Sequence, residues 1–91
     1  MDMGSAPVPC PDLASALDAF PEHAAFIRRL FLADRSFRSA CEDYRLAREG
    51  LATFGRLACE TPRPEVADYQ RLVRELEAEM RNMIHAARGR A

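Results

Sequence analysis

Apolar side chains recur at a helical spacing through residues 21–55. Two interleaved series each have a step of seven. One comprises Leu30, Phe37, Tyr44 and Leu51, and the other Phe26, Ala33, Ala40, Ala47 and Phe54. Alternating steps of three and four place both series on one face of an α-helix, as at coiled-coil core positions. Pro21 and Glu22 suit the first turn of a helix, and Gly55 suits its C-terminal end. The pattern predicts one long helix over about residues 21–55.

The same spacing returns after a strong break. Pro62 and Pro64 interrupt the pattern, so we expect a loop over about residues 56–63 and a second helix over about residues 64–88. Its apolar face comprises Val66, Tyr69, Val73, Leu76, Met80, Met83 and Ala87. A loop this short makes the two helices antiparallel neighbours.

The two apolar faces can be aligned along their whole length. They meet when Phe54 faces Val66, and Tyr44 then faces Leu76. Small alanines mostly face larger side chains in this register, which suits interdigitated packing. The sequence therefore predicts an all-α fold built as an antiparallel two-helix hairpin with coiled-coil-like packing.

This register leaves the start of the first helix without a partner. Its unpaired apolar side chains are Phe20, Phe26, Ile27, Leu30 and Phe31. Exposed clusters of this kind are usually covered. Two covers are open here: the N-terminal tail, folding back through Leu13 and Leu17, or a second chain. Because a two-helix hairpin is marginally stable alone, we favour a second chain, which pairs hairpins into a helical bundle.

Residues 1–19 are predicted to form a flexible or partly helical N-terminal tail ahead of the hairpin at residues 20–88. The tail contains three prolines and three aspartates. Asp12 suits the N-cap of a short helix whose Leu13 and Leu17 share one face with Phe20.

Composition narrows the fold and the compartment. Alanine and arginine are abundant and β-branched residues are few, which excludes a β-rich fold or a parallel sheet with a nucleotide site. The net charge of -1, from 14 acidic and 13 basic residues, argues against a general polyanion binder. We see no secretory signal and no apolar run that spans a bilayer, so we expect a cytoplasmic protein with no membrane partner.

The two histidines and the acid beside one of them offer little chemistry. In the predicted register His85 lies several turns from His23, so the two do not converge on a metal. Glu22 next to His23 lacks a nucleophile and a third orienting group. We therefore predict no catalytic, cofactor-binding or metal-binding residue, and a protein that is not an enzyme.

Three cysteines stand at irregular spacing, which suggests reduced thiols rather than a disulfide framework. Cys41 lies beside the apolar face, within a turn of Arg38 and Arg45. Two interpretations are open: a thiol activated by positive charge, or a buried small apolar side chain, which we favour.

The arginines of both helices are interleaved with acids. Several pairs, such as Asp34 with Arg38, have the spacing of supportive helical ion pairs. This arrangement favours a solvated face over the coherent basic surface that nucleic acid requires. A Rop-like RNA-binding helical hairpin stays open as an alternative, by analogy of fold alone.

Several of these residues carry a family resemblance. They are Phe20-Pro21-Glu22 at the helix start, then Ile27, Leu30, Phe37, Tyr44 and Leu51, and after the break Glu65-Val66, Glu79-Met80 and Met83-Ile84. The chain resembles, over about residues 20–84, the YdcH-like family of small bacterial helical-hairpin proteins of unknown function. The resemblance implies a helical hairpin and brings no catalytic residue. The absence of lysine, the tyrosine at position 44 and the N-terminal tail depart from the family pattern.

Together these features predict a small cytosolic protein–protein interaction module, either an oligomeric adaptor or an accessory subunit. It is expected to form a homo-oligomer or to bind a helix of a partner protein by burial of apolar surface. The predicted interaction residues are those of the unpaired helix start: Phe20, Phe26, Ile27, Leu30 and Phe31.

Overall fold

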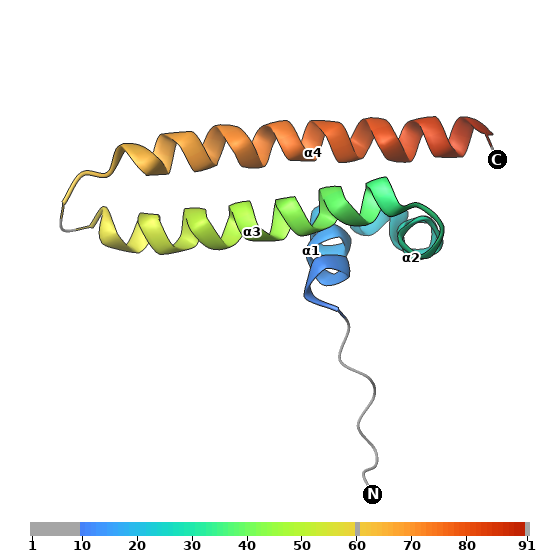
Figure 1. The fold of residues 1–91 in the computed structure, drawn as a ribbon, viewed down its shortest axis with the longest axis horizontal. Coiled ribbons are helices and arrows are strands. Elements are labelled where there is room, and N and C mark those ends of the chain that lie inside the picture. The colour runs from blue at the N-terminus through green and yellow to red at the C-terminus, as the bar shows by residue number, and fades with distance from the viewer. Residues whose placement is uncertain (1–9, 60, 91) are drawn as a thin grey trace, which may run out of the picture.

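The computed structural model of the chain describes residues 10–59 and 61–90. All regular structure in these two ranges is helical, which confirms the all-α prediction. The elements are α1 (Pro11–Ala19), a 3-10 turn η1 (Pro21–His23), α2 (Ala24–Ala33), α3 (Arg35–Leu57) and α4 (Pro64–Arg90), shown in Figure 1. The predicted two-helix hairpin is therefore an incomplete description, because two further helices belong to the same fold.

The two longest helices, α3 and α4, lie side by side and run in opposite directions (Figure 1). The Tyr44 hydroxyl donates a hydrogen bond to Glu77 Oε2 at 2.8 Å. Nearer the connection, the rings of Phe54 and Tyr69 stack with centroids 5.5 Å apart. Both contacts agree with the predicted register to within one helical turn.

The helix expected over residues 21–55 is broken at Asp34, which is a correction to the sequence analysis. Asp34 has an extended backbone, with φ -128° and ψ 110°, and its carboxylate accepts a hydrogen bond from Phe37 N at 3.1 Å. An aspartate in this position is a strong N-cap, because it satisfies a free N–H of the first helical turn. Asp34 therefore begins α3 and separates it from α2.

The same break explains the position of Arg38. Its guanidinium donates to the carbonyl oxygens of Phe31 and Leu32 at 2.8 and 3.1 Å, at the C-terminal end of α2. A cation there satisfies free carbonyls and complements the helix dipole. Asp34 and Arg38 thus cap two different helices rather than pairing along one.

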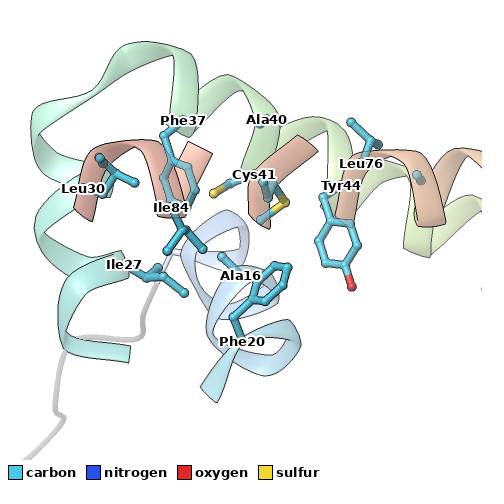
Figure 2. Close-up of a cluster of buried hydrophobic side chains, with 13 residues drawn as sticks. Ala16, Phe20, Ile27, Leu30, Phe37, Ala40, Cys41, Tyr44, Leu76 and Ile84 are labelled. Carbon is cyan, nitrogen blue, oxygen red and sulfur yellow. The ribbon is translucent and has the colours of Figure 1, made fainter. Parts of the chain in front are cut away.

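The main core lies where α1 and α2 meet the N-terminal half of α3 and the C-terminal half of α4. Figure 2 shows Ile27, Phe37 and Ile84 pointing toward one another from three of these helices, with Ala16 and Phe20 beside them. Its fully buried large side chains are Phe37, Ile27, Met80, Ile84 and Cys41. The part of α3 and α4 nearest their connection has no third helix packed on it (Figure 1).

The predicted tail contributes the helix α1 to this core. Leu13 and Leu17 pack against the buried cluster, on the same side as Phe20. Cys10, not Asp12, stands in the N-cap position, so the predicted cap is wrong. Asp12 instead accepts a hydrogen bond from Arg45 Nε, which ties α1 to α3. Residues 1–9 of the predicted tail lie outside the described part of the chain.

Candidate interaction surface

The residues predicted as a docking surface are part of the chain's own core. Phe20 is 3% exposed, Ile27 0% and Leu30 9%. Phe26 and Phe31 are partly buried and pack against the same cluster. The first of the two covers considered in the sequence analysis is the one present, because α1 folds back over this region. The expectation of a fully exposed apolar surface here is corrected: Phe20, Ile27 and Leu30 are buried, whereas Phe26 and Phe31 keep part of their surface exposed.

The two histidines also lie closer than predicted. The rings of His23 and His85 meet edge to face with centroids 6.2 Å apart. The prediction that they stay several turns apart is wrong, because the break at Asp34 redirects α2 and brings η1 next to the end of α4. Arg88 lies beside them, with a guanidinium nitrogen 3.1 Å from His23 Nδ1.

This cluster borders an open hollow of about 390 Å³, lined by Glu22, His23, Ala25, Phe26, Arg29 and Arg88. The guanidinium groups of Arg29 and Arg88 each lie 5.6 Å from the centre of the Phe26 ring. Cation–π contacts of this kind stabilise exposed arginines modestly. The lining contains no side chain in a nucleophile–base arrangement, and in the described part of the chain no three His, Cys, Asp or Glu side chains gather at one point.

Cys41 is completely buried between α1 and the long helices. Burial, helped by the charge of Asp12, raises the pKa of its thiol to about 12. A thiol with so high a pKa stays protonated at neutral pH and is a poor nucleophile. The structure supports the interpretation of Cys41 as a buried apolar side chain.

An apolar groove runs between α3 and α4, and no residue of α1 or α2 lines it. We call it the α3–α4 groove. It consists of two adjoining hollows of about 290 and 340 Å³, lined by Asp43, Leu46, Ala47, Tyr69, Leu72 and Leu76 and by Glu65, Asp68, Tyr69 and Leu72. Leu46 is 49% exposed and Leu72 41% exposed, whereas Leu76 and Ala47 are buried. Two exposed leucines therefore stand over a closed apolar floor.

Gly50 gives this groove its shape. A Cβ atom built on Gly50 would lie 2.5 Å from Cε1 of Tyr69, well inside van der Waals contact. The glycine thus allows the Tyr69 ring to lie directly against α3, where it stacks on Phe54. Helix propensity alone makes Gly50 a weak position in a helix. The predicted register places its neighbour Leu51, not Gly50, opposite Tyr69, so it did not identify this contact.

The charged residues that line the α3–α4 groove are all acidic. They are Asp43, Glu65 and Asp68. One carboxylate oxygen of Glu65, Oε1, is buried and has no hydrogen-bond partner among the described residues. Buried carboxylate oxygens normally have a donor, because losing water without replacement costs free energy. Arg71 donates to Asp68 at 3.0 Å, so Asp43 and Glu65 are the lining acids with no ion pair among the described residues.

Comparisons with known proteins give no family for this chain: no protein-family model matches it, and neither a curated protein nor a solved structure shows significant similarity to it. Among the described helices, none combines the length and the apolar character needed to cross a membrane.

Proposed function

We propose that the protein is a small protein–protein interaction module that binds an apolar segment in the α3–α4 groove. The observation that carries this proposal is the pair of exposed leucines, Leu46 and Leu72, which line one hollow above the buried Leu76. Leucines scattered singly on a surface need no explanation, but leucines that share a hollow with an aromatic side chain favour a binding site.

The chemistry of the groove favours docking over catalysis. Helix-in-groove recognition uses an apolar channel between two helices, filled by side chains repeated at helical spacing on the partner. The α3–α4 groove offers leucine, alanine and tyrosine surface for such anchors. Its carboxylates have no histidine, cysteine or serine beside them in the lining, so it lacks the groups of a nucleophilic site.

This proposal keeps the interaction function predicted from the sequence and moves its site. The proposed docking surface lies between the middle of α3 and the first half of α4, not on residues 20–31. A role as adaptor or accessory subunit, action in the cytoplasm and kinship with the YdcH-like family remain parts of the same proposal. We propose no RNA-binding role, because the lining of the groove is acidic and would repel a phosphate backbone.

The proposal is tested by capturing bound proteins from native cells with the tagged chain and with variants that alter the groove. The tagged chain is compared with the double variant Leu46→Glu/Leu72→Glu and with the control Leu57→Glu, which changes a leucine 43% exposed and outside the groove. Quantitative mass spectrometry is expected to find a protein, or an untagged copy of this chain, whose recovery falls at least about tenfold in the double variant only. That protein is then purified and its binding measured directly. Equal recovery of every bound protein by all three chains would contradict the proposal.

A further inference from the structure

The most exposed large apolar side chain in the described part of the chain is Leu32, at 81%. It belongs to the last turn of α2, and Arg28 and Arg29 precede it by four and three residues. Side chains at these spacings share one side of a helix. Both arginines are exposed, and neither forms an ion pair with an acid of the described chain. We call these three side chains the Leu32 projection: one apolar tip next to two positive charges.

The Leu32 projection and the α3–α4 groove are complementary. The groove offers exposed leucines over an apolar floor, and the projection offers a leucine side chain of matching chemistry. Asp43, Glu65 and Asp68 line the groove, and Arg28 and Arg29 flank the tip. Asp68 is paired with Arg71 at 3.0 Å, so Asp43 and Glu65 carry the complementary charge. Arginine donates several hydrogen bonds and pairs readily with carboxylates, so Arg28 and Arg29 suit the acidic lining.

We propose that the occupant of the α3–α4 groove is a second copy of this chain, which inserts its Leu32 projection. This inference rests on the proposed function and names the partner. One chain cannot make the contact with itself, because α2 lies at the N-terminal end of α3 while the first half of α4 forms the groove (Figure 1). Opposite charges across an interface speed association and select the partner.

Two other occupants fit the charges less well. Two copies joined groove to groove would place the acidic linings against each other, and like charges in contact cost binding free energy. The first nine residues of the chain contain Asp2 and no arginine or lysine, so they do not complement an acidic groove. Among the described residues, the Leu32 projection joins the most exposed large apolar side chain to two positive charges.

A contact between two different surfaces has a distinct consequence for assembly. Each copy keeps a free groove at one end and a free projection at the other, so copies add head to tail unless the rotation closes a ring. One leucine and two arginines form a small interface, which belongs to the weak class. We therefore expect a reversible, concentration-dependent increase in mass over about 10 µM to 1 mM chain.

Light scattering and sedimentation of the purified full chain measure this association. Leu32→Glu removes the projection, Leu46→Glu/Leu72→Glu removes the groove, and Leu57→Glu serves as a control at an exposed leucine outside both. The first two variants are expected to stay monomeric, and the control to behave as the wild type. Circular dichroism confirms folding, which these exposed positions should not disturb. A wild-type chain that is monomeric at about 1 mM overturns the inference.

Mixing the two defective chains gives the decisive result. The Leu32→Glu chain keeps an intact groove, and the Leu46→Glu/Leu72→Glu chain keeps an intact projection. The mixture is expected to form a dimer and nothing larger, because neither chain can extend it. A mixture that stays monomeric while the wild type associates shows that another surface is responsible and overturns the assignment.

The charged part of the contact is tested separately. Arg28→Glu/Arg29→Glu is expected to weaken association at least about tenfold, and raising the salt concentration is expected to weaken the wild type in the same direction. Association unchanged by both overturns the pairing of arginines with the acidic groove. Failure of this inference is distinguishable from failure of the proposed function. If the purified chain never self-associates but captures another protein through the groove, the proposed function stands and only the second copy is removed as the partner.

Discussion

At the scale of single residues, Gly50 has the most specific packing role. Alanine is favoured over glycine in a helix by about 1 kcal/mol, so helix propensity alone predicts that Gly50→Ala is stabilising. The new methyl group would meet the Tyr69 ring at 2.5 Å, and that ring is stacked on Phe54. We expect Gly50→Ala to lower the free energy of unfolding by about 1–3 kcal/mol, as overpacking does. Urea unfolding followed by circular dichroism measures the change.

The chain contains a matched control in the same helix. A Cβ atom on Gly55 meets no atom within 4 Å, so Gly55→Ala is expected to gain up to about 1 kcal/mol. In a Tyr69→Ala chain the clash is absent, so adding Gly50→Ala should not lower the free energy of unfolding below that of Tyr69→Ala alone. If Gly50→Ala stabilises the protein as much as Gly55→Ala, the glycine does not position the ring.

The sequence identified the buried residues better than the exposed leucines of the α3–α4 groove. Phe37, Ala40 and Tyr44 belong to the predicted apolar face and are buried, because helical spacing reports which side of a helix faces a neighbour. Leu46 and Leu72 lie off that face. A leucine at a solvated position is common and carries no meaning until the fold brings another one beside it. The groove was therefore not predictable from either helix alone.

At the scale of elements, the cap at Asp34 decides whether residues 24–57 form one helix or two. Its carboxylate accepts from Phe37 N, and loss of an N-cap costs about 0.5–2 kcal/mol. We expect Asp34→Ala to lower the free energy of unfolding by that amount in urea denaturation. Asp34→Asn keeps an acceptor and should lose much less. Glu42→Ala, at an exposed position within α3, serves as the control. Equal stability of the alanine and asparagine variants would show that the cap contributes nothing.

Periodicity did not reveal this break for a physical reason. Leu30 and Phe37 are seven residues apart, as a continuous heptad requires, and both are buried. They reach one core from two helices that meet at an angle, and a count of residues cannot distinguish this from one straight helix. No glycine or proline interrupts residues 24–49, and Asp34 is an equally ordinary residue on a solvated helix face. The start of α4 at Pro64 was predictable because proline leaves the backbone fewer choices.

At the scale of the whole molecule, the apolar helix start that was predicted to be exposed is largely covered within the chain. The register assumed a straight first helix that extends past its partner. The turn at Asp34 returns α2 to the end of α4, and α1 closes the remaining side with Leu13 and Leu17. The third layer that was expected from a second chain is supplied internally. It packs on one side of the pair, and none of its residues lines the α3–α4 groove.

The whole fold is expected to lose stability at alkaline pH through two buried acids. Burial raises the pKa of Cys41 from 9.0 to about 12, and burial, helped by the Glu77 carboxylate, raises the pKa of Tyr44 from 10.0 to about 12. Between these values the unfolded chain releases protons that the folded chain keeps, so unfolding becomes more favourable as pH rises. Their contribution is complete below the unfolded pKa values and is lost as pH approaches about 12.

Urea midpoints measured across the alkaline range test this expectation, and the composition makes the test clean. The chain contains no lysine, so the side chains that titrate in this range are cysteines and tyrosines. Cys41→Ala and Tyr44→Phe are each expected to be less stable at neutral pH, since one leaves a small cavity and the other loses the hydrogen bond to Glu77. Each should also show a smaller fall of the midpoint with pH than the wild type. If the urea midpoint of the Cys41→Ala/Tyr44→Phe variant falls with pH as steeply as that of the wild type, groups other than Cys41 and Tyr44 cause the fall and the prediction is wrong.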